Sequence, residues 1–354
     1  MPQYKEKLSK LINQVVAQGA SDLHIGVGIE PVTRVSGVLT PMLSEAKLTK
    51  EDMLGYAEVL MLPEYKKRFL ETQEIDFSYE HEDKTRFRGN GYFERGHMAI
   101  ALRLIPRVIR SIAELNLPPN LENFAAREQG FFLVVGPVGQ GKTTTLAALI
   151  EKINTERTEH IVTIEDPIEY LFDNKKSLID QREVRIDTGD FSTALHSVFR
   201  QDVDVVMIGE MRTPETMATA VTAAETGHLV FSTLHTNNAS QTIDRIIDSF
   251  PGSQQDQIRN QLAGSLAGIF SQRLVPRIAG GLIPAYELLI ANSAVANLIR
   301  EKRTHEIQTV IETGAQDGMI DMNRSLAELV RMGEITAESA YSRSLNTKTL
   351  ERLL

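Results

Sequence analysis

The chain has 354 residues, more than one ordinary hydrophobic core accommodates, so we expect two domains. It contains no cysteine, which excludes disulfides, thiolate nucleophiles and cysteine-ligated zinc or iron–sulfur sites. The formal net charge of −9 provides no overall field that attracts DNA or anionic lipid, so we expect no direct nucleic-acid partner.

The N-terminal part of the chain, residues 1–106, predicts a small α+β domain. Its polar start, Met1–Lys10, lacks the apolar segment of an export signal, so the expected location is the cytoplasm. Apolar residues at helical spacing predict a first helix that ends near Gly19, and a second helix over Lys50–Leu62 that Pro63 would stop. Strands are expected over Asp22–Ile25, Val32–Val38, Phe77–Tyr79, Thr85–Phe93 and Met98–Ile105, the last three in an antiparallel sheet.

Residues 107–124 predict a linker and hinge, because prolines interrupt this stretch and it has little periodicity. From 125 to 290, short apolar runs alternate with helical stretches, which is typical of an α/β fold with a mostly parallel sheet covered on both faces. The expected strands are Phe131–Val135, Ile161–Ile164, Val205–Ile208 and Leu229–Leu234, and the expected helices are Thr143–Ile153, Pro214–Glu225 and Ser240–Ser249. Residues 291–354 predict a helical C-terminal region.

A phosphate-binding motif lies between the first of these strands and its helix. The motif G-x-x-x-x-G-K-[ST] is matched at every fixed position by the residues Gly136, Pro137, Val138, Gly139, Gln140, Gly141, Lys142 and Thr143, and Thr144 follows it. Backbone amides of such a loop surround phosphate oxygens, so we expect ATP to bind here. Lys142 would reach the β- and γ-phosphates, and the Thr143 hydroxyl would hold Mg²⁺. The alternative is a chance glycine-rich turn.

Two acidic residues follow buried strands and are candidates for hydrolysis. Glu210 ends the segment that begins with Val205–Ile208, so it is expected beside the metal or the attacking water. Glu165 follows Ile161–Ile164 and is expected to polarise that water. The alternative for these acids is that they are solvated turn residues.

Two histidines and several arginines complete the candidates. His235 lies at the expected carboxyl end of a strand, where it could sense the γ-phosphate, and His228 lies seven residues earlier, so the two need not share a face. Arginines of the small domain could neutralise the transferred phosphoryl group, or they could form a solvated strand face: Arg86, Arg88, Arg95 and Arg103.

These motifs in this order resemble the secretion ATPase superfamily, which drives type II secretion and type IV pili. The segments that look like its Walker A, Asp box, Walker B and His box are Gly136–Thr143, Thr163–Glu169, Val206–Arg212 and His228–Asn237. Ala20–His24 is similar to the start of the family's PAS-like N-terminal domain, and Phe87 and Arg88 with Arg103 resemble its arginine-bearing strands.

The resemblance covers nearly the whole chain and implies a homohexameric ring of RecA-like ATPase cores that uses ATP and Mg²⁺. It implies work on pilin subunits at the inner face of the cytoplasmic membrane, with peripheral association through an inner-membrane pilus platform protein. Carried over to matching positions, it implies these catalytic residues: Glu165, Glu210, His228, His235, Arg88 and Arg103. The residues expected to hold Mg²⁺, from the loop motif and the strand-end position, are Thr143 and Glu210.

Within the superfamily, the chain resembles the retraction branch, the PilT family. Ala294–Glu301 looks like a segment typical of that branch. The longer N-terminal region and four-cysteine zinc motif usual in extension and type II secretion ATPases are missing from this sequence. The phosphate-binding loop departs from the usual family pattern at Val138, Gln140 and Thr143, although Thr143 retains the hydroxyl, and the differing segment Gly89–Met98 leaves the role of Arg95 in doubt.

Three other functions remain open at this point. A pilus-extension or type II secretion ATPase would use the same fold. A regulatory scaffold that binds nucleotide without hydrolysing it would lack a use for Glu165 and Glu210. A DNA translocase is disfavoured by the acidic charge.

Overall fold

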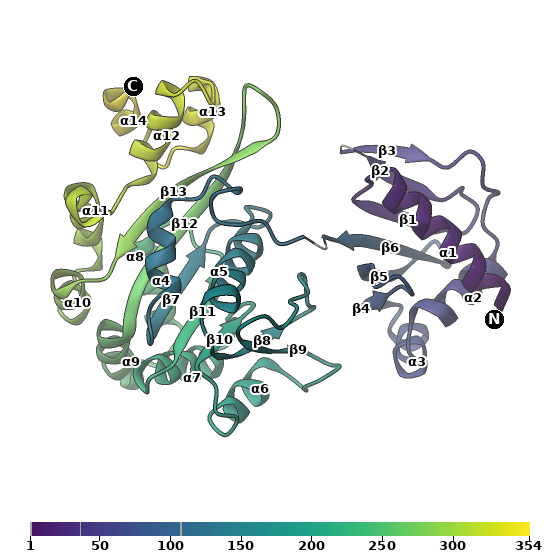
Figure 1. Ribbon diagram of the computed structural model, residues 1–354, viewed down its shortest axis with the longest axis horizontal. Helices are drawn as coiled ribbons and strands as arrows, with labels where there is room; N and C mark the ends of the chain where they lie inside the picture. Colours follow the sequence, from purple (N-terminus) through teal and green to yellow (C-terminus); the bar gives the residue numbers. More distant parts are fainter. Residues whose placement is uncertain (1, 36, 107) are drawn as a thin grey trace. The chain divides into compact units, whose positions relative to one another are not determined.

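The structure is a computed structural model that describes residues 2–35, 37–106 and 108–354. It divides into two compact units, each with its own core (Figure 1). The first unit runs to Val108 and includes the short segment Pro167–Leu171, and the second comprises Ile109–Asp166 and Phe172–Leu354.

Three predicted features involve residues outside the described part of the chain. Met1 starts the first predicted domain, Ser36 falls within the predicted strand Val32–Val38, and Arg107 starts the predicted linker.

The first unit is a six-stranded antiparallel sheet covered on one face by helices (Figure 1). Its strand order is β3-β2-β1-β6-β5-β4. The strands are β1 Asp22–Gly26, β2 Val32–Val35, β3 Val38–Pro41, β4 Glu74–Glu80, β5 Arg86–Glu94 and β6 His97–Ile105, and the helices are α1 Pro2–Ala17, α2 Lys50–Leu60 and α3 Pro63–Thr72.

The elements of this unit follow the apolar spacing of the sequence, with two corrections. The predicted first helix is confirmed as α1, and Gly19 beyond it adopts a φ of +60°. The predicted single strand Val32–Val38 is wrong, because Val35 of β2 pairs with Val38 of β3, so the segment supplies two antiparallel neighbouring strands. Pro63 does not only stop the helix before it, since a proline is favoured at the first position of a helix and here begins α3.

The second unit contains a seven-stranded sheet in the order β13-β12-β7-β11-β10-β8-β9. All neighbouring strands are parallel except the pair β12–β13. Its strands are β7 Gly130–Val135, β8 His160–Glu165, β9 Leu178–Glu183, β10 Val205–Ile208, β11 Leu229–Leu234, β12 Leu266–Pro276 and β13 Leu282–Ile290. Its helices are α4 Glu122–Ala125, α5 Lys142–Glu156, α6 Phe191–Val198, α7 Pro214–Glu225, α8 Ala239–Asp248, α9 Gly252–Ser265, α10 Ser293–Arg300, α11 Ile307–Thr313, α12 Met322–Arg331, α13 Ala337–Arg343 and α14 Thr347–Leu353.

Both faces of the central strands are buried, as continuous apolar runs predict. Along β7, Phe131 and Leu133 pack with the cluster that includes α6 to α11, while Phe132 and Val134 pack with the cluster that includes α4 and α5. The predicted α/β architecture is therefore confirmed. In the described residues, no helix combines the length and the apolarity needed to cross a membrane.

The stretch predicted as a linker is anchored to the second unit over most of its length. Ile112, Leu117, Leu121 and Phe124 are buried in the same cluster as Phe132 of β7. The C-terminal region is helical, as expected, and its last three helices α12–α14 share a small core with β12 and β13.

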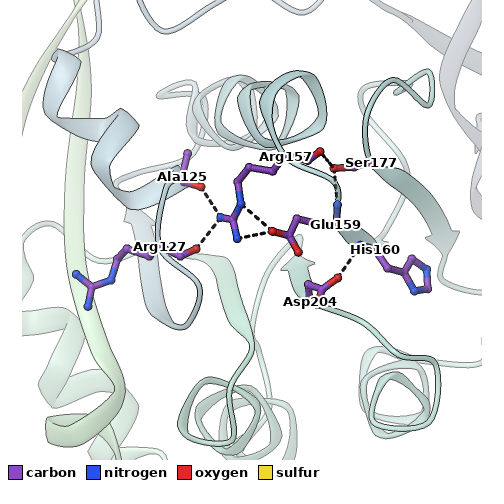
Figure 2. A network of polar contacts seen from close by, with 7 residues as sticks. All are labelled: Ala125, Arg127, Arg157, Glu159, His160, Ser177 and Asp204. Atoms are coloured by element: carbon purple, nitrogen blue, oxygen red, sulfur yellow. Dashed lines mark hydrogen bonds and ion pairs between the residues drawn. The ribbon is translucent and has the colours of Figure 1, made fainter.

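A polar network lies where the parallel strands of the seven-stranded sheet begin, here called the amino edge (Figure 2). Arg157 Nη1 donates to the carbonyl oxygens of Ala125 and Arg127, at 2.7 and 2.6 Å. Its Nη2 and Nε donate to Oε1 of Glu159, at 2.7 and 2.9 Å. Ser177 Oγ donates to the Arg157 carbonyl at 2.8 Å, and these contacts set the chain path between α5 and β8.

His160 extends the network at the start of β8. Its backbone N–H donates to Oδ2 of Asp204 at 2.8 Å. Its Nδ1 lies 2.9 and 3.1 Å from the carbonyl oxygens of Gln201 and Asp202, and its Nε2 lies 2.9 Å from Oδ2 of Asp180. Because both ring nitrogens face acceptors, the geometry favours the doubly protonated ring. Burial lowers the pKa of His160, but the Asp180 carboxylate and the two carbonyls outweigh it and hold the pKa above 6.5.

This network predicts a pH-dependent contribution to stability. A histidine whose pKa is raised on folding stabilises the folded state fully at pH values below its unfolded-state pKa, near 6.5. This stabilisation is lost as the pH rises through the pKa of the folded state. We therefore expect His160→Gln to lower the free energy of unfolding most at about pH 5.5 and least at about pH 9. Urea unfolding of both proteins across this range measures the difference, with His305→Gln on the exposed surface as the control. A difference that is constant with pH would contradict the assigned imidazolium.

Candidate functional site

Four parallel strands end at the same edge of the seven-stranded sheet, here called the carboxyl edge. Val135 of β7 pairs with Leu234 of β11, while Ile208 of β10 pairs with both Ser232 of β11 and Ile164 of β8. The chain leaves these strands side by side, at the edge where ligands bind in open α/β sheets. The candidate residues that emerge there are Gly136, Glu165, Glu210 and His235.

The phosphate-binding loop connects β7 to α5, as the sequence predicts. Gly139 and Gly141 adopt φ values of +76° and +80°, in the left-handed region that favours glycine. At Gly136 the constraint is space, because a Cβ atom there would lie 2.4 Å from the carbonyl oxygen of Gln272 in β12. The loop therefore leads its backbone amides into the N-terminus of α5, an arrangement suited to anionic phosphate.

Residues of strand β12 hydrogen-bond to this loop and to the start of α5, a contact that the sequence did not predict. The Gln272 side chain is buried, accepts a hydrogen bond from Thr145 Oγ1 at 2.6 Å and donates one to the Gln140 carbonyl at 2.8 Å. The Gln140 side chain in turn accepts from the backbone N–H of Leu274 at 2.7 Å. The Gln140 side chain therefore attaches the loop to β12.

Lys142 is buried inside the loop. Its Nζ donates to the carbonyl oxygens of Gly136 and Pro137, at 2.8 and 2.9 Å. It also lies 3.1 Å from Nδ1 of His235. A lysine ammonium group has only donors, so these contacts hold its positive charge among the loop carbonyls and the histidine.

His235 connects Lys142 to Glu210. Since the ammonium group of Lys142 can only donate, Nδ1 of His235 is the acceptor and the ring proton lies on Nε2. Nε2 is 3.6 Å from Oε2 of Glu210, and Oε1 of Glu210 is 2.6 Å from Nη2 of Arg212. A continuous polar chain therefore runs from the phosphate-binding loop to the acid that follows β10.

Glu165 ends β8 and is almost fully buried, with 3% of its surface exposed. Its Oε1 accepts hydrogen bonds from Thr163 Oγ1 at 2.8 Å and Gln181 Nε2 at 3.2 Å. Gly209, which precedes Glu210, donates its backbone N–H to the Ile164 carbonyl at 2.8 Å. This contact brings the chain segments that carry the two acids together at the carboxyl edge.

Arg88 and Arg103 lie in the first unit. They pair directly across β5 and β6, and the Arg103 side chain is 71% exposed. Arg103 Nε donates to Oδ1 of Asp22 at 2.8 Å, and Arg88 Nη1 lies 3.8 Å from Oε1 of Glu169. Burial alone would raise the pKa of Asp22, but hydrogen bonds from Ser21 and Arg103 lower it below its usual value.

His228 lies at the opposite edge of the sheet from His235. It precedes β11, whose six residues separate the two histidines by roughly 20 Å at the usual rise of a strand. Its Nδ1 is 3.1 Å from the Ala223 carbonyl oxygen, and its ring meets Phe199 edge-on with the ring centres 5.6 Å apart. The structure therefore does not bring His228 to the group at the carboxyl edge of this chain.

Comparisons with known proteins agree over most of the chain. Residues 3–281 match the family described as "Type II/IV secretion system protein". The "Twitching motility protein" of Neisseria gonorrhoeae is 42% identical over 321 residues, covering 90% of this chain and 86% of the relative. The "Type IV pilus retractation ATPase PilT" of Pseudomonas aeruginosa is 39% identical over 337 residues, covering 95% and 98%.

A solved structure, described as "Crystal Structure of the Pilus Retraction Motor PilT and Bound ADP", has the same fold. It matches with a TM-score of 0.91 and 44% identity, covering 97% of this chain and 98% of that chain. The match extends over the carboxyl edge and the first unit alike. Together with the family match over residues 3–281, these similarities show that the chain belongs to the type II/IV secretion system protein family.

Proposed function

We propose that this protein is an ATP-hydrolysing motor that powers the retraction of type IV pili. The observation that carries the proposal is the polar chain from Lys142 through His235 to Glu210. It connects a loop built for phosphate to the acid that follows β10, two strands away from β7 in the sheet, so bound phosphate and a candidate catalytic carboxylate share one line of contacts. The similarity to relatives named for retraction and twitching, over nearly their whole lengths, supports the direction of the motor.

Each residue of the carboxyl edge has a separate role in ATP hydrolysis. The loop amides and Lys142 bind the β- and γ-phosphates of ATP. Glu165, held by Thr163 and Gln181, orients the attacking water. His235 touches both the phosphate-binding lysine and Glu210, so it transmits the arrival of the γ-phosphate to that acid.

Magnesium fits the donors available here. Among the described residues, no group of three or more histidine, aspartate or glutamate side chains is arranged to hold a metal unaided. Mg²⁺ prefers oxygen ligands and is commonly held by one or two protein groups together with substrate phosphates. The Thr143 hydroxyl and the Glu210 carboxylate supply such oxygens, and the bound ion would neutralise charge on the phosphates.

The finer features of the proposal follow from the resemblance to secretion ATPases. The first unit is a PAS-like domain, and the second is a RecA-like core. Six copies form a ring at the cytoplasmic face of the inner membrane, where a pilus platform protein is the partner. Arg88 and Arg103 of the first unit stabilise the γ-phosphate, which needs positive charge as the phosphoryl group is transferred.

We expect Glu210→Gln to lower ATP turnover strongly while leaving nucleotide binding intact. The amide keeps the size of the side chain but loses the charge that faces His235 and Arg212, so turnover should fall roughly 10²-fold or more. Phosphate release and ADP affinity are measured on the same samples, together with particle mass to test the six-fold ring.

The control for this variant is Glu215→Gln, an exposed acid in the first turn of α7. It should turn over ATP like the wild type. If wild type binds nucleotide without turnover in any assembly state, the scaffold function replaces the motor.

Variants of Arg88 and Arg103 should differ in their effect on thermal stability, because the two side chains have different partners. Removing an arginine that stabilises the transferred phosphoryl group costs roughly 10³–10⁵-fold in turnover. We expect this loss for Arg88→Gln and Arg103→Gln alike, but only Arg103→Gln should also lower the melting temperature, because it leaves the buried Asp22 with one partner fewer. Arg68→Gln on α3 is the control. Normal turnover in both arginine variants would remove the first unit from the chemistry.

Retraction is distinguished from extension in cells. Expression of the wild type in a piliated strain that lacks its own retraction ATPase should restore twitching and reduce the number of surface pili. Glu210→Gln should restore neither. Rescue of a strain that lacks its extension ATPase, without rescue of the retraction-deficient strain, would favour the pilus-extension function instead.

A further inference from the structure

The segment that follows His235, residues Thr236–Asn238, is here called the β11 loop, and it is held by the paired strands β12 and β13. Ser271 Oγ donates to the carbonyl oxygen of Asn237 at 2.8 Å. The Glu287 carboxylate accepts the backbone N–H of Ala239 at 2.9 Å, where α8 begins. Ser271 and Glu287 pair directly across the two strands, so both contacts come from one face of the sheet.

Arg273 lies two residues beyond Ser271, on the same face, and has two partners of different origin. Its Nη2 donates to Oδ1 of Asn237 in the β11 loop, at 3.1 Å. Its Nη1 donates at 3.1 Å to the carbonyl oxygen of Arg343, the last residue of α13. The planar fork of a guanidinium group can join two such acceptors, and a cation is favoured at the carboxyl end of a helix.

The surroundings of Arg273 oppose its charge. Burial and the neighbouring positive charge of Arg343 lower the pKa of Arg273, and the nearby Glu287 acts in the other direction. Burial raises the pKa of Glu287 to about 7, so near neutral pH this carboxyl supplies only part of a negative charge. Within the described chain, Nε of Arg273 has no hydrogen-bond partner. The position of Arg273 therefore depends on Asn237 and the Arg343 carbonyl. If either acceptor moves, the guanidinium group of Arg273 moves with it and changes its contact with the other.

Arg277 provides an internal comparison. It lies just beyond β12 and pairs with Glu334, with Nη2 and Nε at 2.6 and 2.8 Å from Oε2. It thus holds the connection between α12 and α13, and among the described residues its side-chain hydrogen bonds and ion pair go to Glu334 rather than to the β11 loop. The two arginines both fasten the C-terminal helices to the same hairpin, but only Arg273 also contacts the segment that carries His235.

We propose that Arg273 is a positioning residue that couples the β11 loop to the C-terminal helices α12–α14. The inference rests on the proposed function, because it takes the contact between His235 and Lys142 as the point at which nucleotide is sensed. A shift of His235 moves Asn237 two residues further along, and the fork of Arg273 passes the shift to the end of α13. Coupling of this kind is reciprocal, so a partner bound to α12–α14 would in turn bias His235.

The test compares Arg273→Gln with Arg277→Gln in the full-length protein. Hydrogen exchange of residues 337–346 is measured with and without Mg-ADP, and ATP turnover is resolved into kcat and KM. In the wild type and in Arg277→Gln, ADP should change the exchange of this segment. In Arg273→Gln that dependence should vanish and kcat should fall about tenfold with KM nearly unchanged, within the usual range of coupling energies.

Arg273→Lys guards against a failure to fold. It keeps the charge but cannot bridge both acceptors, so it should lose the ADP dependence while melting within a few degrees of the wild type. Equal behaviour of the Arg273 and Arg277 variants would overturn the proposal, as would exchange in the wild type that ADP does not alter. Absence of ATP turnover in the wild type would instead refute the proposed function, since the exchange measurement needs only nucleotide binding.

Discussion

The site depends on the close approach of two backbones, that of Gly136 at the start of the phosphate-binding loop and that of Gln272 in β12. A side chain at position 136 would overlap the Gln272 carbonyl oxygen, so the loop can follow its path only with glycine there. Because β12 is in place, Gln272 and Leu274 can hold Gln140 and Thr145, and the loop is fixed before any phosphate arrives. Preorganised amides of this kind bind phosphate without the cost of ordering the loop.

The two edges of the seven-stranded sheet are built differently, and the difference separates stability from chemistry. At the amino edge, Arg157 and His160 have their donors matched with carbonyls and carboxylates, which fixes the starts of the strands. At the carboxyl edge, His235 contacts both Lys142 and Glu210, and Glu210 in turn pairs with the exposed Arg212. Lys142, His235 and Glu210 lie beyond the ends of the strands, so their contacts can change without a change in strand pairing.

Much of this arrangement is readable in the sequence, and what is missing has physical reasons. The phosphate-binding loop and the four central strands follow from motif and from continuous apolar runs. The edge strand β9, Leu178–Glu183, is missed because its residues are mostly polar, and the hairpin β12–β13 is missed because its place beside β7 is set by pairing between distant segments. No local pattern reveals that kind of pairing.

The histidines show the same limit at the level of single residues. In sequence, His235 falls at the carboxyl end of the predicted strand, while the family resemblance implies a catalytic role for His228 as well. The direction of β11 places only His235 beside Lys142, and that direction is fixed by neighbouring strands. The hydrogen bond of Gln140 to Leu274 could not be foreseen either, since the loop motif leaves that position free.

The support that β12 gives to the loop also bears on how the protein is made. Gln272 and the Gln140 carbonyl that it contacts are 132 residues apart in the chain. When the phosphate-binding loop has been synthesised, β12 has not yet been made. Contacts between segments this far apart also form late in folding, because closing the intervening chain costs entropy. The supported loop is therefore completed only after β12 has been synthesised and has paired with β7, so nucleotide binding marks a subunit in which that pairing is in place.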